Sequence, residues 1–154
     1  MSLYSGQMAQ KNIYQSVLKT IGAEDMVKEP INRDYDIIHV IRKGLYMKNL
    51  LKLAQQMSLS LKEISAILPV SERTLKRYRS TTRLSPELSE RLLKLSHLYN
   101  KGLEVFGNKD SFIIWLNSEL LALGGNKPIE ILDTQNGIEM AVNILGRIEH
   151  GIYS

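Results

Sequence analysis

Apolar residues recur at intervals of three and four along most of the chain, the spacing that places side chains on one face of a helix. In the first half, this pattern predicts helices over residues 11–21, 37–43, 46–56, 61–68 and 72–79. Residues 37–43 are rich in β-branched side chains, so a short strand is an alternative there. The first helix, over residues 11–21, stands apart from the others, and we expect it either to pack on the domain or to form a dimer contact.

Two short helices in the middle of the chain have clear start and stop signals. Ser60 and Glu63 have the spacing of a capping box at the start of the first of them. Pro69 ends that helix, because proline disfavours helical backbone at the residue before it. Ser71 can cap the second helix after a tight turn, in which Pro69 replaces the usual glycine. This arrangement predicts a helix-turn-helix, with residues 72–79 as its recognition helix.

The second half of the chain continues the helical pattern. It predicts a long helix that starts at the Ser85-Pro86 pair and ends at Gly107, a short helix capped by Asp110, a helical turn from Pro128 through Leu132, and a last helix that is capped by Asp133 or Thr134 and ends at Gly151. Gly124 and Gly125 indicate a break that needs either positive φ or close approach of two backbones. A short strand near this pair is a further alternative.

These elements predict a mainly α fold, in which a helix-turn-helix module is followed by a small helical module. We expect an N-terminal extension with one helix over residues 1–35, the helix-turn-helix module over residues 36–83 and the C-terminal module over residues 84–154. Trp115 could offer a stacking surface, but the apolar residues around it favour a place in the core.

Positive charge is concentrated on one short stretch. Residues 71–83 hold five basic residues and one acidic residue, whereas residues 84–154 hold six basic and nine acidic residues. A basic helix in a helix-turn-helix suits the phosphate-lined groove of DNA, although charged runs are also common on solvated surfaces. We expect Arg73 and Lys76 to reach base edges, with further contacts, mainly to phosphates, from Ser71, Thr74, Arg77, Arg79 and Arg83. A module of this size is expected to read a palindromic operator as a homodimer.

The remaining composition argues against several other classes of protein. The chain has no cysteine, which fits a reducing cytosol, and its N-terminus has no apolar region typical of a signal peptide. No apolar run reaches the length of about 18 residues that a membrane span needs, so we expect a cytoplasmic protein with no membrane partner. The three histidines are too far apart in the sequence to indicate a metal site: His39, His97 and His150.

No pattern typical of an enzyme active site is present, and the sequence predicts neither a cofactor nor a metal. The carboxylates that stand near basic residues have the spacing of helix-stabilising ion pairs instead, namely Glu87 with Arg91 and Glu90 with Lys94. Gly124 and Gly125 lack the lysine and the third glycine of a nucleotide-binding loop.

Several motifs of the second half follow one another in the order found in one known family. They are Phe106-Gly107 with Trp115-Leu116, then Leu123-Gly124-Gly125 with Pro128, then Leu132-Asp133-Thr134 with Gly137, and then Leu145-Gly146-Arg147-Ile148 with Gly151. With the basic RTLKRY helix before them, they resemble the Xre/MbcA/ParS antitoxins. The resemblance runs from about Ile37 to Ser154.

The resemblance implies a type II antitoxin that pairs a helix-turn-helix with a C-terminal toxin-binding domain. Its partner would be a RES-domain toxin, an enzyme that depletes NAD, and the antitoxin would be the inhibitor rather than the enzyme. The resemblance also implies that the antitoxin represses its own operon. The residues that would approach and block the toxin's active site are Arg147, His150, Gly151, Ile152, Tyr153 and Ser154.

Two alternatives belong to other classes of protein. The first is a plain helix-turn-helix regulator whose C-terminal module only dimerises, although the apolar Ile152 and Tyr153 at the end of the chain are not needed for that role. The second is a small catalytic or ligand-sensing domain that uses the loop at Gly124 and Gly125.

Overall fold

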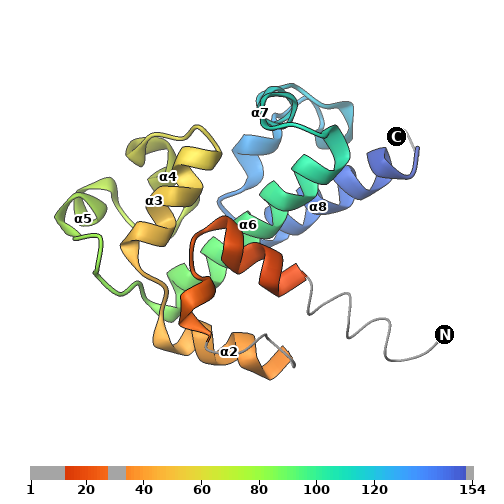
Figure 1. The fold of residues 1–154 in the computed structure, drawn as a ribbon. Helices are drawn as coiled ribbons and strands as arrows, with labels where there is room; N and C mark the ends of the chain where they lie inside the picture. The colour runs from red at the N-terminus through yellow and green to blue at the C-terminus, as the bar shows by residue number, and fades with distance from the viewer. Residues whose placement is uncertain (1–12, 28–33, 152–154) are drawn as a thin grey trace, which may run out of the picture.

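The computed structural model describes residues 13–27 and 34–151, and these residues are mainly helical, as the sequence predicts (Figure 1). A helix over residues 13–20 precedes the labelled elements, which are η1 (Glu24–Met26), α2 (Asp34–Lys43), α3 (Met47–Gln56), α4 (Leu61–Ile67), α5 (Glu72–Arg77), α6 (Pro86–Phe106), α7 (Lys109–Leu116), η2 (Leu121–Leu123), η3 (Pro128–Ile131) and α8 (Gln135–Glu149). No strand forms within the described residues, where Tyr46 and Arg83 make an isolated antiparallel bridge.

Both strand alternatives are therefore wrong. In α2 the buried residues Ile37 and Val40 are three positions apart, whereas His39 is exposed. This is the period of a helix, and an alternating strand would have buried residues 37 and 39 together. Around Gly124 the chain forms the 3₁₀ helices η2 and η3.

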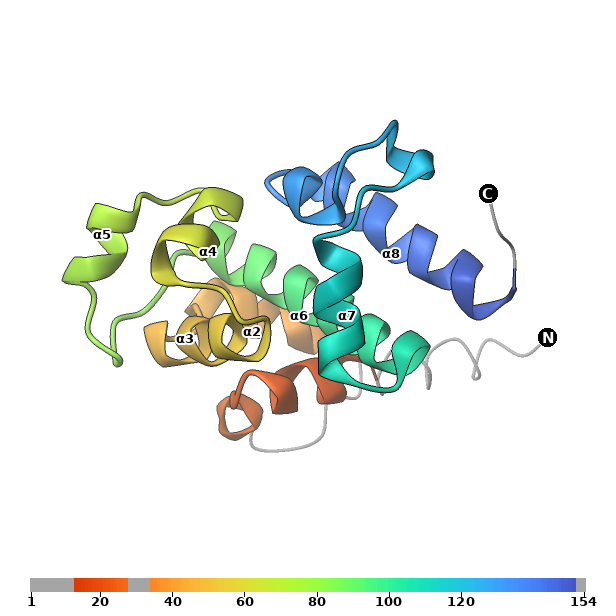
Figure 2. The same ribbon diagram turned by 90° about the horizontal axis from the view of Figure 1, so that it is seen from above.

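α6 is the central element of the fold. It packs against α2 and α3 on one side and against α7 and α8 on the other, so both halves of the chain share its buried leucines (Figures 1 and 2). Leu92, Leu95 and Leu98 on α6 are fully buried. Gly102 lies against the Phe112 ring of α7, where an added Cβ would overlap the ring atoms. The absence of a side chain at Gly102 therefore allows α7 to pack closely against α6.

The aromatic residues after α6 form part of the core, which confirms the expectation for Trp115. Its side chain is 7% exposed, and its ring stacks on Phe112 at 6.0 Å between centroids. Tyr99 forms a T-shaped pair with Phe112, with 5.8 Å between the ring centroids, and donates a hydrogen bond to Gln56 Oε1 at 3.3 Å. Burial raises the pKa of Tyr99. This cluster connects α7 with the end of α3 across α6.

The helix over residues 13–20 packs on the domain. Val17, Leu18 and Ile21 are buried, and the carbonyl of Ile21 accepts a hydrogen bond from the buried Asn49 amide at 2.8 Å. The same Asn49 accepts from the backbone N–H of Tyr46 at 2.8 Å and so caps α3. A single buried amide therefore fixes the N-terminal helix to the start of α3.

Most helix starts agree with the sequence. Ser60 and Glu63 form the expected capping box at 3.1 Å in both directions, Ser85 caps α6, and Thr134 rather than Asp133 caps α8. The expected cap of α7 at Asp110 is wrong, because Asn108 accepts from the Ser111 N–H at 2.8 Å and starts the helix earlier. No helix of the described residues has the length and apolar character that crossing a membrane requires.

Candidate functional site

The helix-turn-helix is built from α4, α5 and the turn between them. Pro69 ends α4 as expected: Leu68 is extended, and its carbonyl accepts from the Val70 N–H at 2.8 Å. Ser71 then caps α5 by accepting from the Thr74 N–H at 3.1 Å, and its hydroxyl donates to Thr74 Oγ1 at 2.9 Å. Ser71 and Thr74, both expected at DNA, thus face each other at the start of α5.

The exposed side of α5 is basic. Arg73, Lys76 and Arg77 are exposed, and their spacing of three and four residues places them close together on the helix surface. Lys76 Nζ lies 3.1 Å from Glu72 Oε1. Leu75, on the opposite side, is 1% exposed and holds α5 against α4. The structure therefore brings three of the sequence-predicted cations together.

α5 ends at Arg77, two residues before the predicted end, so Arg79 lies beyond it. Tyr78 is already extended, and the Arg79 N–H donates to Thr82 Oγ1 at 2.9 Å. The following loop pairs with the start of α3, where the Met47 N–H donates to the Thr82 carbonyl at 2.9 Å. The recognition helix is therefore followed by a segment that combines a local turn with long-range pairing to the start of α3.

Arg83 has a structural contact that the sequence did not indicate. Its guanidinium lies 4.2 Å from the centre of the Tyr46 ring and donates to the Gly44 carbonyl at 2.8 Å. The Lys48 ammonium approaches the same ring at 5.3 Å. Arg83 therefore holds the loop after α5 against the start of α3. Lys48 is a second cation beside the Tyr46 ring, and its spacing along the sequence could not have predicted that position.

The C-terminal candidate residues gather at the end of α8. Arg147, His150 and Gly151 are exposed, whereas Ile152, Tyr153 and Ser154 lie outside the described residues. Lys101 Nζ on α6 bonds Glu149 Oε1 at 2.9 Å, and this hydrogen bond raises the pKa of Lys101. His150 Nε2 lies 4.0 Å from the same carboxylate oxygen. The ion pair between α6 and α8 thus fixes the position from which the chain's last residues leave.

The start of α8 is formed by the Leu132-Asp133-Thr134 motif and Gly137. Thr134 Oγ1 accepts from the Gly137 N–H at 2.9 Å, and a Cβ on Gly137 would overlap the Ile131 carbonyl. Two cations of α6 also bond to the start of α8. Arg91 donates to the Asp133 carbonyl at 2.9 Å, and Lys94 donates to Gln135 Oε1 at 2.9 Å. They therefore join α6 to α8, in place of the ion pairs expected with Glu87 and Glu90.

α5 and the end of α8 lie at opposite ends of the molecule, as both views show (Figures 1 and 2). The two sets of candidate residues therefore form two separate surfaces rather than one site. Within the described ranges, no group of three or more histidine, aspartate or glutamate side chains is arranged to hold a metal ion.

Comparison with known proteins gives each half of the chain a family. Residues 36–96 match the model of the antitoxin Xre-like helix-turn-helix domain, and residues 101–151 match that of the antitoxin Xre/MbcA/ParS C-terminal toxin-binding domain. The first match ends and the second begins inside α6.

Individual antitoxins are similar to this chain over both domains. The chain is 27% identical over 127 residues to Antitoxin Xre of Yersinia enterocolitica, and this similarity covers 81% of this chain and 86% of the relative. It is 31% identical over 129 residues to the Prs ADP-ribosylating antitoxin of a Sphingobium species, and this similarity covers 77% of this chain and 81% of the relative. The chain therefore belongs to the Xre/MbcA/ParS antitoxins of toxin–antitoxin systems, with a helix-turn-helix domain followed by a toxin-binding domain.

Proposed function

We propose that this antitoxin neutralises a RES-domain toxin that depletes NAD, and that it represses its own operon. The observation that carries the proposal is the presence of both domains in one chain, with a DNA-binding type followed by a toxin-binding type. The name of the Sphingobium relative includes ADP-ribosylation, a reaction that uses NAD as donor, which is compatible with a toxin that consumes NAD. In this proposal the chain is the inhibitor and performs no catalysis.

The end of α8 is the part that we assign to the toxin's active site. Arg147, His150 and Gly151 are exposed there, and the Lys101–Glu149 ion pair holds this end of α8 in a fixed direction. Residues 152–154 continue from it and would enter the substrate pocket. Arg147 and His150 would contact the rim of that pocket, so that the tail blocks access of NAD.

α5 is the part that we assign to the operator. Its length and exposed cations suit the major groove, with Arg73 and Lys76 at base edges and Arg77 at phosphate. Arg79 and Arg83 flank the helix and would contact the phosphate backbone. Ser71 and Thr74 would contribute polar contacts at its N-terminal end. Two copies would read a palindromic operator, and binding would weaken steeply as salt rises.

Co-expression with the product of the neighbouring gene tests the toxin half of the proposal. Purification by a tag on one protein should retrieve both, and NAD consumption should appear only after this chain is stripped away. Two proteins that fail to associate, or a partner that consumes no NAD, would contradict it. Both proposed partners belong in the cytoplasm, which is where we expect this chain to act.

A further inference from the structure

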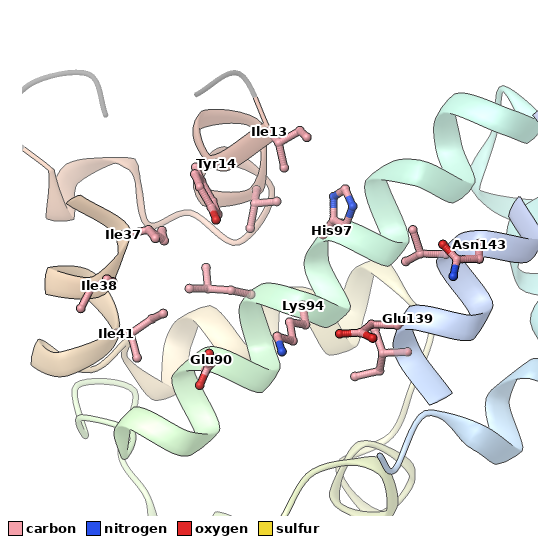
Figure 3. Close-up of a pocket in the computed structure, with 14 residues that line it drawn as sticks. Ile13, Tyr14, Ile37, Ile38, Ile41, Glu90, Lys94, His97, Glu139 and Asn143 are labelled. Carbon is pink, nitrogen blue, oxygen red and sulfur yellow. The ribbon is translucent and has the colours of Figure 1, made fainter. Parts of the chain in front are cut away.

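An apolar groove of about 790 Å³ lies on the flank of the molecule (Figure 3). The helix over residues 13–20 and α2 form one wall, α8 forms the other, and α6 lies between them. Its apolar lining comes from all four helices and includes Val17, Ile37, Ile41, Leu93, Ile138 and Val142. The family matches begin at residue 36, so one wall is built partly by a segment that neither match covers.

Apolar side chains also project from the rim of this groove. Ile13 and Ile38, which both line it, are 39% and 38% exposed. Tyr35 precedes Ile38 by three residues on α2, is 49% exposed, and meets the His39 ring edge-on at 5.0 Å. A hollow and projecting apolar groups on one surface are what a two-fold contact between identical chains requires, because each copy supplies both parts.

The charges in the groove also favour a second copy of this chain. Glu90 and Glu139 are acidic, Lys94 is basic, and all three line the same hollow. A two-fold related copy can set the acid of one chain against the base of the other. A nucleic acid, with negative charge throughout, would meet two carboxylates here.

The position of the groove leaves both proposed functional surfaces uncovered. α2 and the helix over residues 13–20 lie between α5 and the end of α8 in both views (Figures 1 and 2). We propose that this groove is the interface between two copies of the chain, and that Ile13 and Ile38 of each copy insert into the groove of the other. The inference rests on the DNA-binding part of the proposed function, because reading a palindrome calls for two copies.

Sedimentation equilibrium on the full-length protein tests this interface, with Ile38→Glu as the variant and Leu51→Glu as the matched control. Leu51 is 44% exposed on α3 and does not line the groove. A carboxylate buried at the contact should raise the dimer dissociation constant by about tenfold or more. We expect the wild type and Leu51→Glu to dimerise alike. Equal dimerisation of all three proteins, or a wild type that stays monomeric, would overturn the inference.

A labelling experiment keeps the test decisive even where Ile38→Glu fails to fold. The chain has no cysteine, so Ile38→Cys and Leu51→Cys each introduce a single thiol. Labelling of the first thiol should slow as protein concentration rises through the dimer range, whereas labelling of the second should not change. A dimer in which both thiols react at constant rates would place the contact elsewhere and overturn the inference.

Operator and toxin binding, measured on the same samples, separate the two proposals. A wild-type protein that binds operator DNA as a monomer overturns the dimer interface and leaves the antitoxin function standing. A dimeric protein that fails to bind the toxin overturns the toxin half of the proposed function and leaves the interface standing.

Discussion

Gly102 is a residue at which one added methyl group should disturb the core directly. Its Cβ would overlap the ring of Phe112, which is fully buried and in contact with the rings of Tyr99 and Trp115. Overpacking of this kind costs about 1–3 kcal/mol, and a confined aromatic ring favours the upper end. We therefore expect Gly102→Ala to destabilise the fold, although alanine favours a helix over glycine by about 1 kcal/mol.

Gly146→Ala is the matched control, because Gly146 also lies within a helix and its Cβ would meet open space. Urea denaturation should show a lower free energy of unfolding for Gly102→Ala and an unchanged or higher one for Gly146→Ala. Equal stability of the two variants would mean that α7 does not approach α6 as closely as described.

His97 should make the fold less stable in mild acid. Burial lowers its pKa below the ordinary value of 6.5, nearby Lys101 lowers it further, and Glu104 opposes this. Of the charged groups that line the same groove, Lys94 and Glu90 lie on α6 with His97, and Glu139 lies on α8. Because the unfolded chain takes up the proton first, stability falls as pH drops below the unfolded pKa.

His97→Gln removes that proton uptake, so its stability should fall less than that of the wild type between about pH 7 and pH 5.5. Thermal or urea unfolding at several pH values measures the difference. To separate folding from assembly, both proteins are compared in the Ile38→Glu background. Parallel stability curves would exclude His97 as the source of the acid sensitivity.

At the scale of elements, most helix starts could be predicted, whereas the end of α5 could not. A cap such as Ser60 or Ser71 bonds a backbone N–H three residues later, so its signal is local in sequence. The segment after α5 pairs with the start of α3, and within this pairing Arg83 stacks on Tyr46. Contacts of this range leave no periodic pattern in the sequence.

The basic side of α5 should be necessary for DNA binding and unnecessary for toxin binding. We expect Arg73→Glu combined with Lys76→Glu to abolish operator binding, because it places carboxylates where phosphates and base edges are approached. Fluorescence anisotropy with operator DNA at several salt concentrations measures the first effect, and an NAD-consumption assay with the toxin measures the second.

Lys19→Glu is the control for charge, since Lys19 is exposed on the helix over residues 13–20. It should bind operator DNA nearly as the wild type does. If the α5 variant folds and yet loses toxin neutralisation together with DNA binding, the assignment of the two functions to separate surfaces is wrong.

At the scale of the whole molecule, α6 is the element that holds the two surfaces apart. Both matched domains end or begin within it, so they share one helix instead of being joined by a linker. The two domain types and their order along the chain could be predicted from the motifs in the sequence. The groove could not, because Ile38, Leu93 and Val142 are brought together only by the packed helices.

Removal of residues 152–154 should separate the two functions from the opposite side. The cut lies beyond the Lys101–Glu149 ion pair, so α8 keeps its contact with α6 and the fold should stay intact. We expect the truncated protein to leave NAD consumption by the toxin largely uninhibited, because the active site is no longer filled, and to bind operator DNA with unchanged affinity.

Co-purification distinguishes two routes to that result: a truncated chain that still associates with the active toxin marks the tail as the blocking element, whereas lost association makes it part of the docking surface. Full inhibition by the truncated protein would show that other residues of the toxin-binding domain block the toxin.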